Sequence, residues 1–163
     1  MPSPFWARVL PQVKAAHPYS WIFGEVIHGD YPRIIEESTM DSITQYELWK
    51  SIQHALETEN FFELDWNLKR HNAFLDSFVP QTFIGNHDVT RIASQIGPAK
   101  AALALAVLMT VGGVPSIYYG DEQGYVASSR SVSAAMTTYV RSSPAPLPNC
   151  PRWESRHTGC IRR

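Results

Sequence analysis

Residues 80–88 read PQTFIGNHD, an apolar run of strand length that ends in three polar residues. Residues 19–25 (YSWIFGE) and 114–122 (VPSIYYGDE) have the same form, and residues 40–46 (MDSITQY) are a weaker version. Their apolar residues are continuous and do not alternate with polar ones, which is typical of strands covered on both faces. We therefore predict four buried strands, each with a polar tip.

Helical patterns separate these strands. We expect helices over residues 4–16, over the stretch that follows residue 46, over residues 60–78 and over residues 98–111. Thr44 and Glu47 have the spacing of a capping box that would begin the second of them. Alternation of helices with apolar strands predicts an α/β fold with a parallel sheet covered by helices.

Carboxylates stand at the strand tips, where folds of this kind bind their ligands. These residues are Glu25, Asp88, Asp121 and Glu122. Apolar surroundings favour the neutral form of a carboxylic acid, which can then donate a proton, whereas a second carboxylate in polar company stays ionised. Two carboxylates with separate roles are the minimum for cleaving a glycosidic bond. Asp121 and Glu122 could instead begin a helix and complement its dipole.

Aromatic and polar side chains near the tips could contact a sugar. Trp21, Tyr31, Tyr118 and Tyr119 offer flat rings, and His87 could donate a hydrogen bond to a sugar hydroxyl. A structural interpretation exists for each feature. Tyr118 and Tyr119 could simply pack in a strand, and Asn-His-Asp after glycine often forms a turn whose side chains bond to the backbone.

Three stretches, in this order, resemble the α-amylase family of glycoside hydrolases: WIFGEVIHGDY, FIGNHDVTR and GVPSIYYGDEQG. DSITQYELWKSI resembles the sixth strand of that family and its helix. The resemblance covers residues 1 to about 124 and implies a partial TIM (β/α)8 barrel, about strands 5–8 with their helices. Residues 1–124 would then be the C-terminal part of a glycosidase catalytic barrel.

The same resemblance implies roles for individual residues. Glu25 matches the general acid/base, and Asp88 matches the carboxylate that holds sugar hydroxyls and stabilises the transition state. His87 resembles the histidine that contacts the same sugar. We add Asn86, Tyr31 and Trp21 to the expected substrate-binding residues. Arg91 could orient the Asp88 loop or lie on the surface.

The family also needs a catalytic Asp on its fourth strand, upstream of the acid, whereas residues 1–24 contain no Asp or Glu. We therefore expect a fragment that acts on α-glucan or maltooligosaccharide by a retaining mechanism, with little or no hydrolysis by this chain alone. The missing N-terminal half-barrel would be its partner. The residues themselves indicate no cofactor; the family resemblance implies calcium, although no dedicated ligand cluster is visible in the sequence.

Two other functions stay open. The chain could be a non-catalytic half-barrel or sugar-binding fragment that needs a partner. It could also be a metallophosphoesterase, because GNHD resembles the metal-bridging Asn and the adjacent His of that family. A two-metal site needs several further His and Asp ligands.

The charge of the chain changes near residue 124. Residues 1–124 carry eight Lys/Arg and fourteen Asp/Glu, whereas residues 125–163 carry six Arg, one Glu and both cysteines, Cys150 and Cys160. We interpret residues 125–163 as a disordered or frameshifted tail, with a basic interaction tail as the alternative. The overall net charge of −1 gives no indication of nucleic-acid binding.

Two features of the sequence bear on localisation. The N-terminus lacks a secretory pattern and residues 1–124 lack cysteine, so we expect a cytoplasmic protein. Residues 101–119 are uncharged and long enough to span a membrane. Because this stretch contains Gly112-Gly113 and Pro115, a buried helix followed by a strand explains it better. We therefore expect no membrane partner.

Overall fold

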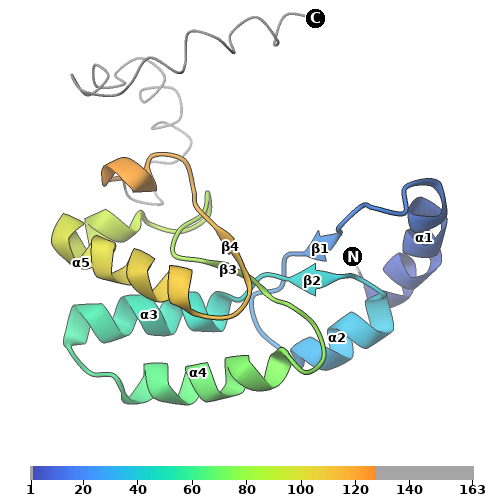
Figure 1. The fold of residues 1–163 in the computed structure, drawn as a ribbon, viewed down its shortest axis with the longest axis horizontal. Helices are drawn as coiled ribbons and strands as arrows, with labels where there is room; N and C mark the ends of the chain where they lie inside the picture. The colour runs from blue at the N-terminus through green and yellow to red at the C-terminus, as the bar shows by residue number, and fades with distance from the viewer. Residues whose placement is uncertain (1, 128–163) are drawn as a thin grey trace, which may run out of the picture. The chain divides into compact units, whose positions relative to one another are not determined.

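The computed structural model of the protein describes residues 2–127. Its elements, in chain order, are α1 (Ser3–Ala16), β1 (Phe23–Gly24), α2 (Tyr31–Ser38), β2 (Ser42–Ile43), α3 (Tyr46–Thr58), α4 (Phe62–Phe74), β3 (Gln81–Phe83), α5 (Ile92–Thr110), β4 (Val114–Ser116) and the short 3-10 helix η1 (Asp121–Gln123) (Figure 1). Nearly all of the tail predicted for residues 125–163 lies outside the described residues, so its interpretation stays a prediction.

The strands pair in parallel, as predicted. β1 pairs with β2, and β3 pairs with β4. A parallel bridge between Thr44 and Gln81 links the two pairs, which gives the order β1-β2-β3-β4. Parallel neighbours need crossover connections, and α2, α3 with α4, and α5 supply them.

The strands are shorter than predicted because their polar tips leave the sheet. Residues 80–88 contribute a strand only over Gln81–Phe83. Beyond it, the side chain of Asn86 accepts hydrogen bonds from the backbone N–H groups of Asp88 and Val89, which turns the chain. A side chain that bonds to its own backbone competes with strand pairing.

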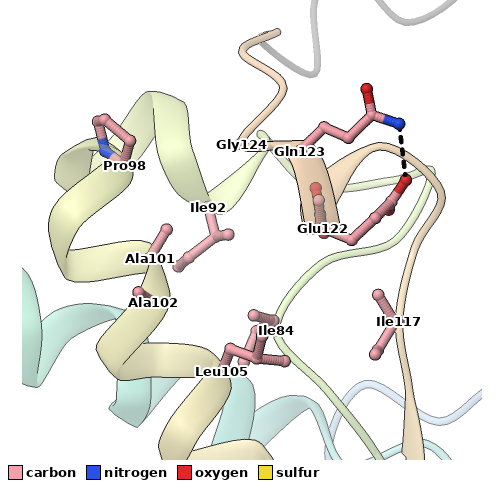
Figure 2. A pocket seen from close by; sticks show the side chains of 11 residues that line it. Ile84, Ile92, Pro98, Ala101, Ala102, Leu105, Ile117, Glu122, Gln123 and Gly124 are labelled. Atoms are coloured by element: carbon pink, nitrogen blue, oxygen red, sulfur yellow. Dashed lines mark hydrogen bonds between the residues drawn. The ribbon is translucent and has the colours of Figure 1, made fainter. Parts of the chain in front are cut away.

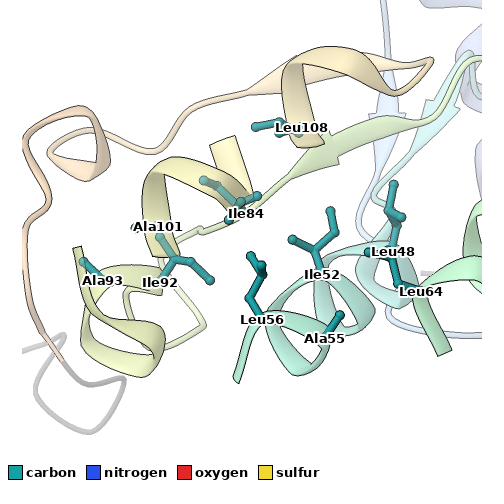
Figure 3. Close-up of a cluster of buried hydrophobic side chains, with 11 residues drawn as sticks. Leu48, Ile52, Ala55, Leu56, Leu64, Ile84, Ile92, Ala93, Ala101 and Leu108 are labelled. Carbon is teal, nitrogen blue, oxygen red and sulfur yellow. The ribbon is translucent and has the colours of Figure 1, made fainter. Parts of the chain in front are cut away.

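The main hydrophobic core lies between α3 and α5. Figure 3 shows side chains from these helices directed toward one another, with Ile84 between them. The α3 side chains in this core recur at helical spacing, as the sequence predicts; they are Leu48, Ile52, Ala55 and Leu56. On its other side α3 packs against α4 (Figure 1). The core therefore fixes α3, the helix that leaves the end of β2.

The helix predicted over residues 98–111 is present, but the expectation that it is buried is wrong for one face. α5 begins at Ile92, and its axis is interrupted at Gly97, where φ is +79°. Leu103 and Met109 are 55% and 48% exposed, because α3 covers only one face of α5.

α5 is also the one described helix long and apolar enough to cross a membrane by length and composition. A core helix meets the same criterion, and Lys100 in α5 donates a hydrogen bond to the carbonyl of Leu56 in α3. The expectation that this chain has no membrane partner stays a prediction.

One helix was not predicted, and the cap of another was assigned to the wrong residue. α2 was not predicted, although Asp30 followed by Pro32 is a typical start; the Asp30 carboxylate accepts a hydrogen bond from the backbone N–H of Arg33. The predicted Thr44 cap of α3 is wrong. Gln45 caps α3, and the hydroxyl of Thr44 bonds to the backbone of Val26.

A buried polar link joins α4 to the loop before β4. His71 is fully buried, and its Nε2 lies 2.6 Å from the carbonyl oxygen of Gly112. Because a carbonyl can only accept, Nε2 carries the proton and Nδ1 accepts from the amide of Gln45. Burial lowers the pKa of His71, and the hydrogen bond to Gly112 offsets this only in part.

Candidate active site

A chain of hydrogen bonds crosses the carboxyl ends of three neighbouring strands. The Tyr46 hydroxyl lies 2.7 Å from Oε1 of Glu25, and Nδ2 of Asn86 lies 2.7 Å from the same hydroxyl. Glu25 directly follows β1, Tyr46 begins α3 after β2, and Asn86 follows β3. The strand tips therefore meet at one edge, as expected for a parallel sheet.

Tyr46 was not among the site residues predicted from the sequence. Its ring is buried and contacts the rings of Phe83 and Trp49 at centroid distances of 4.9 and 6.0 Å. Burial, followed by the hydrogen bond to Glu25, raises the pKa of Tyr46 to about 12, so the phenol stays protonated at neutral pH. Its position could have identified it, because Tyr46 places a hydroxyl at the end of the strand predicted over residues 40–46, and two other predicted strands end in polar residues.

In the loop after β3, Asn86 is fixed by hydrogen bonds, whereas His87 and Asp88 are exposed. Oδ1 of Asn86 accepts hydrogen bonds from the backbone of Asp88 at 3.0 Å and of Val89 at 3.1 Å, which is the turn considered as an alternative. His87 and Asp88 project outward, with side chains 63% and 55% exposed, and His87 Nε2 lies 3.5 Å from Asp88 Oδ1. His87 and Asp88 are therefore open to a ligand, whereas both ends of the Asn86 amide have protein partners.

The two aromatic residues expected to contact sugar lie in different surroundings. Trp21 is exposed, and its ring packs against Phe23 at 4.9 Å. Tyr31 is fully buried, with its ring 5.4 Å from that of Phe74 and its hydroxyl donating to the carbonyl of Ile27. The expected role of Tyr31 is corrected: as the first residue of α2, it packs in the core and offers no open face.

Arg91 is buried, contrary to the surface alternative. Its guanidinium lies 2.8 Å from Oδ1 of Asp121, and the two side chains are 8% and 2% exposed. The same group donates to the carbonyl of Tyr119 and lies 4.2 Å from the ring centre of Tyr118. Arg91 therefore ties the loop after β3 to the segment after β4.

The Asp121 carboxylate is enclosed by protein. Burial raises its pKa, against the opposing effect of Arg91. Its second oxygen, Oδ2, accepts no hydrogen bond from residues 2–127 and lies so near to Gly85 that a Cβ there would collide with it. Asp121 and Glu122 begin η1, which confirms the helical interpretation of this pair.

An open pocket of about 270 Å³ lies between α5 and η1. In Figure 2, Ile84, Leu105 and Ile117 face this hollow. Its lining contains no aromatic ring, and most of it is aliphatic. Glu25 instead lines a pocket of about 260 Å³ together with Trp6 and Phe23, which can supply flat apolar faces to a ring.

Within residues 2–127 there is no group of three or more His, Cys, Asp or Glu side chains that could hold an ion. The several His and Asp ligands that a metallophosphoesterase requires are therefore not gathered around His87 in this part of the chain. Calcium, which also binds to carbonyl oxygens, stays a prediction of the family resemblance.

Comparison with known proteins identifies the fold and the relatives. The family model for the catalytic domain of alpha amylase matches residues 3–157. A 4-alpha-glucanotransferase of Thermotoga neapolitana is 32% identical over 123 residues, which is 74% of this chain and 24% of that protein. A cyclomaltodextrinase of Thermoanaerobacter pseudethanolicus is 33% identical over 132 residues, 75% of this chain and 22% of that protein.

Solved structures give the same result for the fold. The alpha-amylase of Geobacillus thermoleovorans, in complex with acarbose, superimposes with a TM-score of 0.68 at 23% identity over 78% of this chain and 31% of that one. The chain thus spans about a quarter of the length of the curated relatives it matches.

Proposed function

The chain belongs to the alpha-amylase family of glycosidases and glucanotransferases, and from that premise we propose that it acts on α-glucosidic linkages through Glu25. The observation that carries this proposal is the position of Glu25. Its exposed carboxylate lies at the carboxyl edge of a parallel sheet, held by Tyr46 and linked through Asn86 to the loop of His87 and Asp88.

In the proposed reaction Glu25 first acts as an acid. It donates a proton to the glycosidic oxygen as the bond from that oxygen to the anomeric carbon breaks, so that the leaving sugar departs with a neutral hydroxyl and the anomeric carbon bonds to the nucleophilic carboxylate that the other half of the barrel would supply. In the second step water attacks the anomeric carbon, the Glu25 carboxylate accepts a proton from that water, and the bond to the nucleophile breaks. A sugar hydroxyl of an acceptor in place of water gives transfer instead of hydrolysis.

Asp88 and His87 have the second role. Both side chains are exposed on the loop after β3, where a carboxylate can accept hydrogen bonds from sugar hydroxyls and offset the positive charge that develops at the anomeric carbon. Trp21, beside Phe23, would supply a ring face to a sugar unit. Maltooligosaccharides are the proposed substrates because the relatives are named for action on glucans of this kind.

We also propose that β1 to β4 are strands 5–8 of a (β/α)8 barrel. The exposed side chains of Phe23 on β1 and Val114 on β4 lie on the two outer strands of the sheet, where a further set of strands could cover them. On this proposal the nucleophilic Asp comes from a strand that is not among the described residues, and the upstream half-barrel is the partner.

Reducing-sugar release from maltooligosaccharides tests the function. The chain is assayed alone and after co-expression with the upstream half-barrel of a relative, each with wild-type, E25Q and E36Q forms. Glu36 is an exposed carboxylate on α2 and serves as the matched control. We expect little release by the chain alone and release in the co-expressed sample that E25Q lowers by about a thousandfold or more and E36Q leaves unchanged. Release that survives E25Q contradicts the role of Glu25.

A further inference from the structure

The orientation of the Asn86 amide is fixed by its own loop. Two backbone N–H groups, of Asp88 and Val89, donate to one end of this amide. Only the carbonyl oxygen Oδ1 can accept them, so Nδ2 must be the atom that faces Tyr46. An assignment often left open between the two ends of an amide is thereby determined.

The direction of the next hydrogen bond follows. An amide nitrogen only donates, so the Tyr46 hydroxyl oxygen accepts from Asn86 Nδ2. The single hydroxyl proton then remains for the other neighbour, Oε1 of Glu25, at 2.7 Å. Among these three side chains, the Tyr46 hydroxyl can therefore donate its proton only to Oε1 of Glu25.

Tyr46 is held in place by packing, whereas Glu25, the last residue in the series of hydrogen bonds from Asn86 through Tyr46, is exposed. Tyr46 begins α3, the helix fixed by the main core, and its ring is enclosed by Phe83 and Trp49. Glu25 follows a strand of two residues, and Tyr46 is its only side-chain donor within residues 2–127. Proton transfer requires that the reactive group be held in a defined orientation, and a buried, packed hydroxyl can hold an exposed carboxylate in this way.

We propose that Tyr46 is a positioning residue for Glu25, which holds Oε1 by a donated hydrogen bond and leaves Oε2 as the oxygen that exchanges the proton with the sugar. The catalytic part of this inference rests on the proposed acid/base function of Glu25; the contact itself does not. Through Asn86, the same hydroxyl also sets the loop of His87 and Asp88 relative to Glu25.

The contact is tested by NMR on the full chain with ¹³Cζ-labelled tyrosine. Y46F identifies the Tyr46 resonance among the seven tyrosines. In the wild-type protein we expect the Tyr46 resonance to shift as pH is lowered through the range in which carboxylic acids titrate. Asp88 also acts on Tyr46 electrostatically, so the comparison is made in a D88N background. There E25Q should abolish the pH-dependent shift, and E36Q should preserve it. A flat Tyr46 resonance in D88N, or a shift that persists in D88N/E25Q, overturns the proposal.

The positioning role is tested separately by kinetics in the co-expressed sample. Y46F keeps the ring and removes the hydroxyl, so we expect kcat to fall by about 10- to 100-fold with KM nearly unchanged. An unchanged kcat for Y46F overturns the positioning role. If E25Q leaves hydrolysis intact while the Tyr46 resonance still depends on Glu25, the proposed function fails and the contact stands, so the two failures are distinguishable.

Discussion

Two carboxylates, one in the segment after β1 and one in the segment after β4, have opposite surroundings. We call Glu25, Tyr46, Asn86, His87 and Asp88 the open edge. Glu25 is exposed there and accepts one hydrogen bond from a buried tyrosine.

We call Gly85, Arg91, Tyr118 and Asp121 the buried clamp. Asp121 is enclosed there, paired with Arg91 and packed against Gly85. An ion pair out of water holds loops together, whereas an exposed carboxylate on a fixed donor can meet a ligand. A carboxylate is thus half of an internal ion pair in one place and, on the proposed function, the reactive group in the other.

The largest effect on stability is expected at the buried clamp. R91M leaves the Asp121 carboxylate buried without its charge partner, which should lower the free energy of unfolding by about 3–5 kcal/mol. Chemical denaturation measures it. R33M is the matched control, because the Arg33–Glu37 pair is exposed on α2 and contributes little. Equal losses in R91M and R33M would show that the clamp does not depend on burial.

Removing the charges of both Arg91 and Asp121 tests whether the stability of the buried clamp depends on their pairing. R91M/D121L replaces the pair with apolar side chains, and because no charge is then left unpaired, we expect it to recover most of the stability lost in R91M. A double variant as unstable as the single one would mean that Arg91 acts through Tyr118 and Tyr119 and not through Asp121.

Much of this contrast lies beyond what a sequence can predict. Alternation of helices with apolar runs is a local pattern, so the parallel sheet and the α3 core face are predicted correctly. The burial of Arg91 depends on Asp121, thirty residues away, and on the path of the chain between them. Tyr31 was misjudged because α2, which directs its ring to Phe74, was not predicted.

A smaller loss is expected for G85A. A Cβ at this position would collide with the Asp121 carboxylate, which cannot move freely because Arg91 holds it. Overpacking of this kind costs about 1–3 kcal/mol. Thermal unfolding measures the loss, and the cost should shrink when G85A is made in a D121A background. A G85A protein as stable as the wild type would mean that the Asp121 carboxylate can move away from the added Cβ at little cost.

The pH dependence of stability is a further prediction. The pKa of His71 is lowered in the folded state from its ordinary value of 6.5, so below pH 6.5 the unfolded chain binds a proton that the folded chain resists. Stability is therefore full above pH 6.5 and falls as the pH drops below it, by at most about 1.4 kcal/mol per pH unit from this one group.

Urea unfolding at several pH values measures this effect. H71Q removes the titrating group and should flatten the His71 part of the profile, so a slope that is unchanged in H71Q would assign the acid loss to other residues.

The smallest effect on stability is expected at the open edge. H87A and D88N change exposed side chains, so we expect the free energy of unfolding to stay within about 0.5 kcal/mol of the wild type. The same substitutions should weaken maltotriose binding. A large loss of stability in either variant would place His87 or Asp88 among the structural residues.

The most direct test of the whole account is to map maltotriose on the chain by backbone amide NMR. We predict that the shifts caused by maltotriose gather around Glu25, His87 and Asp88, while the amides of Arg91 and Asp121 stay unchanged. Shifts centred on the buried clamp or on the aliphatic pocket beside α5, or no shift anywhere, would contradict the claim that the open edge is the sugar-binding part of this chain.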